Sequence, residues 1–408
     1  MSNSNIFSKP VSIVVFLLLL VLVVFFESYA FKNSAVTSKE TENIKVIKTI
    51  PISSSANLQV VGGSDTLANF KYKDANEYRF HNPEEFYEIL EKSAIKYIFD
   101  IASDLTPYTF IKESLSLLPI NPGLCIKYTG QDSFSIIEAK VSPDVESLLV
   151  DAIKHLKNNN FDKVIDTYKK ALLIDSSYFK AYTLLGDSYY LNGNYDSAEI
   201  YLKKAIELNE IDYQAYFFLA DVYLKKGNLK NALTEITHAF MLNKNSTIIN
   251  GRLNDFLEPN GLQINKNRLK FPFELNQVSD TLLSVKFGED QGIKWMPMAM
   301  CLACWKMEPD FKELIERHPD SLNFEIQMYK ECMANQWAAI LYDIEQDSVV
   351  TDTEMTLYSI IEDGYLNAIV YWEIMTTKYP MVILTMPKEE KQKVVEYIEK
   401  YVYTKRNP

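Results

Sequence analysis

The chain has 408 residues, 47% of them hydrophobic, which is enough for roughly two or three domains with a substantial core. Tyrosine (26) and phenylalanine (22) are abundant and glycine is scarce (12), which favours helices packed through aromatic side chains over a glycine-rich sandwich. The formal net charge of −12 would repel a phosphate backbone and argues against nucleic acid as a partner, and four cysteines are too few for a disulfide-built scaffold.

The amino terminus carries an apolar run, Val11–Phe26, which only Ser12 interrupts. Its sixteen residues match the core of a signal peptide and fall short of the about 20 that a membrane-spanning helix needs. Ser28 and Ala30 provide the small side chains that a signal peptidase reads, which predicts cleavage after Ala30. The alternative keeps the run as a membrane anchor. Either interpretation makes residues 1–30 a signal peptide or anchor and places the rest on the periplasmic or extracytoplasmic side.

Residues 31–80 are rich in Ser, Thr, Asn, Lys and Glu. Such a composition buries too little surface to order a chain, so we expect a flexible tether. For residues 81–144 we expect a small mixed α/β module. Its helix begins at Asn82 and Pro83, and its apolar positions continue to about Ala102. A predicted hairpin completes the module with two strand-like runs and their turn: Cys125–Tyr128, Ser133–Ile136 and 129–132.

Between Val145 and Ser246 the sequence repeats with a period of 34 residues. Such a period indicates a helical hairpin that stacks on its own copies. Small residues in each copy let two helices approach closely, and Gly193 and Gly227 allow a left-handed turn where a helix ends. The second and third copies share five positions: Tyr182/Tyr216, Leu185/Leu219, Tyr189/Tyr223, Ala198/Ala232 and Ala205/Ala239. The matching positions of the first copy are Leu148, Asp151, His155, Val164 and Ala171, of which Ala171 alone keeps the shared residue.

This segment, residues 145–246, resembles the tetratricopeptide repeat family. The copy Phe179–Asp212 carries the match best, although the family's helix-ending proline is replaced by Ser176, Glu210 and Lys244 in the three copies. The resemblance implies a solenoid of about three helix-turn-helix repeats that binds another protein or a peptide segment of it. A further helix at Ser246–Leu257 is expected to cap the stack and to extend this domain to residues 145–262.

By the same resemblance, the first helix of each repeat lines a concave face. The positions that map there are Leu149, Ile153, Leu156, Thr183, Asp187, Tyr190, Phe217, Asp221 and Leu224. They mix apolar and acidic groups, which suits a segment with apolar anchors and a Lys or Arg. Family members that clamp a chaperone's terminal carboxylate have asparagines where this chain has Ile153, Asp187 and Asp221. The alternative is that these side chains coat a solvated surface or dock on the carboxy-terminal domain.

Residues 263–408 resemble no family that we recognise and are expected to form an α-helical domain, so that the whole chain is mostly α. Two short strands are predicted at Leu269–Leu275 and Thr281–Phe287. Helices are predicted at 297–307, 310–317, 322–345, 353–378 and 388–404.

The carboxy-terminal region holds one cluster of potential metal ligands. Cys301 and Cys304 lie on one helical face, and with His318 and Cys332 they could supply a tetrahedral zinc site. Against zinc, the spacing matches no common pattern, and the neighbouring Trp and Met residues are typical of a core that holds buried thiols. A redox pair of cysteines is the third interpretation. No cofactor is expected.

The leading hypothesis is a non-catalytic protein-interaction scaffold, exported or tethered to a membrane only by its amino-terminal helix. The sequence has no Gly-rich phosphate loop and no nucleophile turn, and its four histidines are far apart. One alternative is an enzyme or a metal or redox protein with its site in 263–408 and the repeats as a docking arm. Another is a structural component of an envelope assembly.

Overall fold

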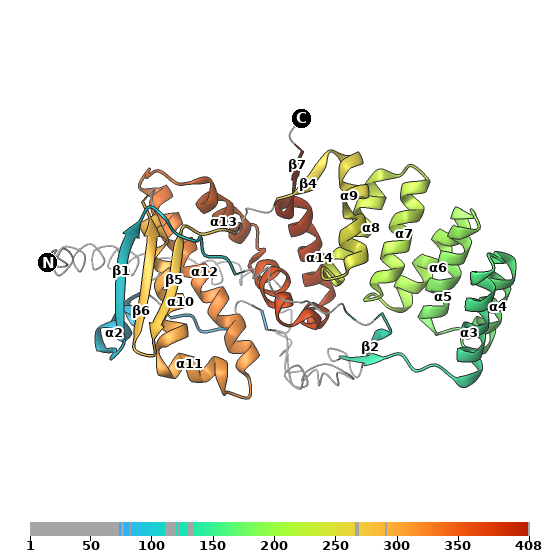
Figure 1. Cartoon of the computed structure of the whole chain (residues 1–408), viewed down its shortest axis with the longest axis horizontal. Helices are drawn as coiled ribbons and strands as arrows, with labels where there is room; N and C mark the ends of the chain where they lie inside the picture. The colour runs from blue at the N-terminus through green and yellow to red at the C-terminus, as the bar shows by residue number, and fades with distance from the viewer. Residues whose placement is uncertain are drawn as a thin grey trace, which may run out of the picture. The chain divides into compact units, whose positions relative to one another are not determined.

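The computed structural model describes residues 73–74, 77–81, 83–110, 120, 122–128, 134–265, 269–289 and 292–406. The expected signal peptide or anchor, most of the tether and the hairpin turn lie outside them. The fold is mostly helical (Figure 1), as expected, and the chain divides into two compact units. Among the described residues, one unit holds 73–110 and 269–370, and the other holds 120–265 and 371–406.

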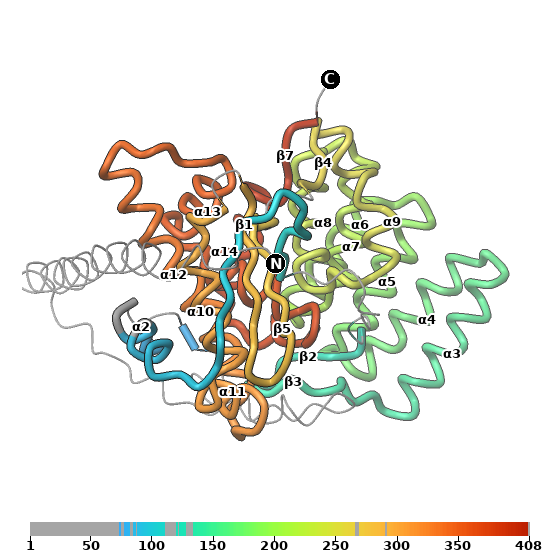
Figure 2. The backbone as a smooth tube through the Cα atoms, turned by 60° about the vertical axis from the view of Figure 1, so that its left-hand side comes forward, coloured from blue at the N-terminus to red at the C-terminus, as the bar shows by residue number. Residues whose placement is uncertain are grey.

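The repeat segment forms three successive helical hairpins in its described residues (Figures 1 and 2). They are α3 (Pro143–Lys157) with α4 (Phe161–Ile174), α5 (Phe179–Leu191) with α6 (Tyr195–Leu208), and α7 (Tyr213–Lys225) with α8 (Leu229–Leu242). The small side chains of Ala198 and Ala205 are fully buried, which allows the close approach expected of them. Gly193 and Gly227 have φ angles of 78° and 76°, so both turns place a glycine in the left-handed region, where the first repeat has Asn159 with a φ of 54°. The predicted repeat solenoid is confirmed.

The departures of the first copy have a physical reason. In the later copies, Tyr189 and Tyr223 contact the second helix of the preceding repeat, with Lys169 and Lys203 over their rings at 5.6 and 5.7 Å. In the described part of the chain no repeat precedes the first copy. Its equivalent residue is His155, which is partly exposed and pairs with Asp151 at 3.5 Å. A polar outer face of this kind is what a terminal repeat requires.

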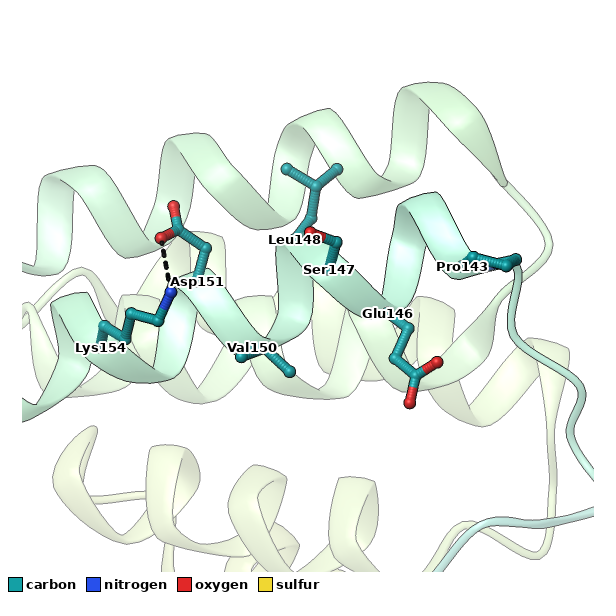
Figure 3. Close-up of a pocket in the computed structure, with 7 residues that line it drawn as sticks. All are labelled: Pro143, Glu146, Ser147, Leu148, Val150, Asp151 and Lys154. Atoms are coloured by element: carbon teal, nitrogen blue, oxygen red, sulfur yellow. Dashed lines mark ion pairs between the residues drawn. The ribbon is translucent and has the colours of Figure 1, made fainter.

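A hollow of about 480 Å³ lies on this outer face of α3 (Figure 3). Asp151 and Lys154, which form an ion pair at 3.7 Å, are among the residues that line it. Every lining residue belongs to α3: Pro143, Glu146, Ser147, Leu148, Val150, Asp151 and Lys154. The hollow is therefore an open end of the stack.

The end of the chain packs on the last repeat. Trp372 donates from its indole nitrogen to the carbonyl of Met241 in α8 at 3.1 Å, and Lys244 donates to the carbonyl of Trp372 at 2.6 Å. Antiparallel strands β4 and β7 join the two segments further (Figures 1 and 2). The elements are α9 (Thr247–Leu257), β4 (Leu262–Ile264), α14 (Lys388–Tyr397) and β7 (Tyr403–Lys405). The helix predicted at 388–404 is α-helical to Tyr397 and continues as a π-helical segment, Ile398–Val402, so it overshoots only where β7 begins.

The predicted hairpin is confirmed as strands β2 (Leu124–Tyr128) and β3 (Phe134–Glu138), which pair antiparallel. Two asparagines of the repeats hold the segment that leads into it. The side-chain amide of Asn209 donates to the carbonyl of Leu124 at 2.9 Å, and the amide of Ile120 donates to the Asn243 side chain at 3.3 Å. Because Asn209 and Asn243 are one period apart, equivalent places on successive repeats hold one extended segment.

The other unit contains a three-stranded sheet of order β1-β6-β5 (Figure 1). Its strands are β1 (Lys96–Ala102), β5 (Phe273–Ser279) and β6 (Leu282–Gly288). Strands β5 and β6 correspond to the two predicted short strands, with β5 beginning four residues later than expected; they pair antiparallel, and β1 pairs parallel with β6. The helix expected to reach Ala102 is therefore wrong beyond α2 (Pro83–Lys92). The side chain of Ser93 accepts from the amide of Ile95 and starts an extended segment, and pairing with β6 then favours a strand.

Helices complete this unit: α10 (Met296–Met307), α11 (Pro309–Glu316), α12 (Ser321–Glu345) and α13 (Asp352–Glu362). The single helix predicted at 353–378 is wrong beyond Glu362, because Gly364 takes a left-handed φ of 81° and a π-helical segment follows at Ala368–Ile374. Among the helices described, none combines the length and apolarity needed to cross a bilayer.

Candidate functional site

The residues expected on the concave face occupy three columns, because members of each column are one period apart. We call these nine positions the first-helix face. The columns are Leu149, Thr183 and Phe217, then Ile153, Asp187 and Asp221, and finally Leu156, Tyr190 and Leu224. Their surroundings decide which of them a partner could contact.

The first column is covered by the chain itself. Leu149 packs against the buried cluster around Ala152. Thr183 is fully buried and donates its hydroxyl to the carboxylate of Asp212, which also pairs with Lys180 at 3.8 Å. Burial raises the pKa of Asp212, although Lys180 opposes that change. Thr183 therefore belongs to a network inside the repeats and offers no surface to a partner.

The third repeat is closed by a residue that the sequence reasoning missed, Arg252 of α9. Its guanidinium pairs with the carboxylate of Asp221 at 2.7 Å and lies 5.8 Å from the ring centre of Phe217. Only 6% of Asp221 and 8% of Phe217 stay exposed. The available signal was an arginine in the expected capping helix, three residues before Asp255. The chain's own cap thus occupies these two predicted contacts.

Asp187 differs from its equivalent Asp221. It is half-buried, and in the part of the chain that the structure describes no hydrogen bond or ion pair reaches its carboxylate. Burial raises the pKa of Asp187 from 3.8 to about 6, and the nearby charge of Asp221 adds to the rise. An unpaired carboxylate in such a place favours the arrival of a cation.

The remaining positions around Asp187 are open to different degrees. Ile153 is 48% exposed, and Leu191, at the end of α5, is 46% exposed. Tyr190 is half-buried, with its ring 5.7 Å from that of Tyr195. Leu156 and Leu224 are half-buried too. The most exposed position of the first-helix face, Ile153, therefore lies on α3, and the face's unpaired carboxylate, Asp187, lies on α5.

A second cavity, of about 380 Å³, lies where α14 packs on the repeats. Its buried Lys391 pairs with Glu210 at 2.9 Å, and its His238 stacks on Tyr216 with ring centres 5.0 Å apart. Burial lowers the pKa of both Lys391 and His238. These groups are paired with each other and hold the end of the chain on the repeats.

The structure does not bring the four candidate zinc ligands together. Cys301, Cys304 and Cys332 are buried, which confirms the core interpretation of these thiols, whereas His318 is exposed. His318 accepts instead from the amide of Asp320 at 3.0 Å. Among the described residues, no group of three or more potential ligands is placed to hold a metal ion.

A comparison with family models agrees with this fold. A family model described as "Tetratricopeptide repeat" matches residues 152–210 and 183–236. Among solved structures, the chain is similar to the first TPR of Spaghetti bound to an HSP90 peptide (21% identity, TM-score 0.27), with 28% of this chain and 92% of that one covered. It is also similar to the Yersinia enterocolitica type III secretion chaperone SycD in complex with a peptide of the translocator YopD (20% identity, TM-score 0.28), with 29% and 93% covered.

No curated protein matches the chain significantly. The family match runs from within α3 to within α8, and the period, the small buried residues and the glycine turns of these hairpins are those expected of the family. Repeats of this kind are typically non-catalytic and serve interactions between proteins. Residues 145–246 are a segment of tetratricopeptide repeats.

Proposed function

We propose that this protein is a non-catalytic scaffold that binds a peptide segment of another protein on α3 and α5 of its repeats. The observation that carries the proposal is the unpaired, half-buried carboxylate of Asp187, together with the exposed apolar side chains of Ile153, at the equivalent position of α3, and Leu191, one helical turn further along α5. The bound segment has apolar anchors and one Lys or Arg that pairs with Asp187.

The chemistry of the site supports this choice of ligand. Asp187, Asp221 and Asp255 carry three negative charges, and Arg252 supplies one positive charge among them. A basic side chain therefore gains from this field, while an acidic one is repelled. Apolar anchors seated on Ile153 and Tyr190 supply most of the affinity, since a few apolar or aromatic contacts usually dominate such interfaces.

Selection of short peptides of random sequence on the full chain tests the proposal. We expect enrichment of peptides that carry a Lys or Arg between apolar residues. Ile153→Asp and Asp187→Asn should each weaken the binding of a selected peptide at least tenfold, equivalent to about 1.4 kcal/mol. Ile200→Asp is the matched control, because Ile200 lies on the second helix α6 and is 67% exposed. Equal losses in all three variants would refute this location.

We further propose that the chain is exported, or held at a membrane, by the apolar run Val11–Phe26. This part of the proposal rests on the sequence, where Ser28 and Ala30 stand at the positions that a signal peptidase reads. Sequencing the amino terminus of the mature protein is expected to give Phe31 as the first residue. A start at residue 1 or 2 would refute cleavage and leave the membrane anchor as the remaining form.

The absence of catalysis is also part of the proposal, and the carboxylates of the unit with the sheet support it. Glu331 is fully buried, accepts from the indole of Trp305 and pairs with the imidazole of His81 at 2.8 Å. Glu308 accepts from the hydroxyl of Ser93 at 2.7 Å. These contacts join segments that are far apart in the sequence, which is a structural role.

A further inference from the structure

Two of the four cysteines meet inside the unit that holds the sheet. Cys301 on α10 and Cys332 on α12 are 1% and 0% exposed, and their sulfur atoms are 2.8 Å apart. The two helices pack directly against each other, so the contact belongs to the core of the unit. A disulfide needs a separation of about 2.05 Å, which makes these sulfurs bonding partners within about 1 Å of movement.

We propose that Cys301 and Cys332 form a native disulfide when the protein folds in the presence of a disulfide oxidant such as oxidised glutathione. One cysteine thiolate attacks oxidised glutathione, which gives a mixed disulfide and releases one glutathione thiolate. The second cysteine thiolate then attacks the mixed disulfide and releases the other. The two cysteine sulfurs are oxidised, one glutathione disulfide is reduced, and the two protons from the cysteines end on the glutathione thiolates.

The proposal is specific for this pair. Cys304 is also buried, one helical turn further along α10, but among the described residues the sulfur of Cys332 is in contact with that of Cys301. Cys125 lies on β2 in the other unit. The geometry therefore singles out one pair among the four thiols.

Burial determines when the bond forms. It raises the pKa of Cys301, Cys304 and Cys332, so little thiolate is present in the folded unit and a reagent cannot reach it. The exchange consequently takes place during folding, before α10 and α12 close over the sulfurs. Once formed, the bond is shielded from reductants in the same way and closes a loop that contains α11.

The test refolds the full chain from denaturant, once with oxidised glutathione and once with a phosphine reductant. Free thiols are then alkylated in denaturant, and the protein is digested without reduction for mass spectrometry. We expect a peptide pair that joins Cys301 to Cys332 after oxidative refolding, with Cys125 and Cys304 alkylated. The oxidised chain should unfold about 5–10 °C higher than the reduced chain, since a loop of this length is closed.

Two variants sharpen the result. Cys304→Ser should keep the linked peptide pair and the difference between oxidised and reduced unfolding temperatures, whereas Cys332→Ser should lose both. The parent chain alone can refute the proposal, even where a variant fails to fold. Four alkylated cysteines after oxidative refolding would overturn it, and so would a link that uses Cys304 or Cys125 in place of Cys301.

Discussion

The first and third repeats are the same kind of helical hairpin, but different segments pack against their first helices. In the first, Ile153 of α3 is 48% exposed. In the third, the equivalent Asp221 of α7 is 6% exposed, because Arg252 of the capping helix pairs with it. One period fixes both positions on a first helix, so the difference arises from what lies next to each repeat.

The comparison shows that the position of a side chain on a repeat and its accessibility have different causes. The period determines which side chains point to the first-helix face, and neighbouring segments determine which of them stay accessible. Asp187 lies between the two extremes, close to the charge of Asp221 but without the cation that Asp221 has. The most exposed position of the face, Ile153, therefore lies on the repeat furthest from the capping helix.

The largest expected change in stability concerns two buried alanines. It tests whether the first and third repeats pack their two helices against each other in the same way. Ala171 and Ala239 are equivalent and fully buried. Ala171→Leu and Ala239→Leu should each lower the free energy of unfolding by about 1–3 kcal/mol, because a larger side chain overpacks the helix contact. Urea unfolding measures the loss, and Lys170→Leu, at an exposed neighbouring position, is the control. Unchanged stability in both alanine variants would mean that the repeat alignment is wrong.

The next prediction concerns the contact that Arg252 of the capping helix α9 makes with the third repeat. Arg252→Ala should lower the free energy of unfolding by about 1–2 kcal/mol, because Asp221 is left without its cation and Phe217 loses its cover. Asp255 also pairs with Arg252 but is exposed, so Asp255→Ala should stay within about 0.5 kcal/mol of the parent. Equal losses in the two variants would mean that the exposed pair matters as much as the buried one.

Sequence reasoning could predict the repeats, because their evidence is local and recurs at a fixed spacing. The same residues named the first-helix face, but they could not show that Arg252 covers two of its nine positions, since that contact depends on the orientation of the capping helix. The pairing of β1 with β6 was also beyond reach. Its partners, such as Tyr97 and Leu283, are far apart in the chain, and a short apolar run fits a helix or a strand equally well.

The meeting of Cys301 with Cys332 has a similar explanation. Sequence spacing showed that Cys301 and Cys304 share a helical face, and a single helix can show no more than that. The partner of Cys301 is set by how α10 packs on α12, which places Cys332 opposite Cys301 and leaves His318 at the surface. Contacts within one helix are predictable from spacing, and contacts between helices depend on the packing angle.

Replacement of Asp187 is expected to have a smaller effect and to raise the free energy of unfolding, whereas the variants above lower it. Its folded pKa of about 6 exceeds the ordinary value of 3.8, so the folded state binds the proton more tightly. The stability from this proton is complete below pH 3.8 and is lost as the pH rises through about 6. Asp187→Asn should therefore raise the free energy of unfolding by about 1 kcal/mol at pH 7 and leave it nearly unchanged near pH 4.

Urea unfolding at the two pH values measures this difference, and Asp166→Asn, at an exposed position on α4, controls for the loss of one negative charge. A destabilised Asp187→Asn variant at pH 7 would show that the carboxylate has a structural partner. Such a result would remove the reason to regard Asp187 as a vacant position for a basic side chain.

The smallest effect on stability is expected at the open end of the stack. Asp151 and His155 stand where the second repeat has Leu185 and Tyr189, and they are partly exposed, since no repeat precedes them in the described part of the chain. The double change Asp151→Leu with His155→Tyr should alter the free energy of unfolding by less than about 0.5 kcal/mol, since no interior contact changes. It would give α3 the apolar surface with which later repeats stack, so concentration-dependent self-association should appear in sedimentation velocity. A variant that stays monomeric and loses stability would show that these two residues support the fold from within, and the open end would then have to be placed elsewhere.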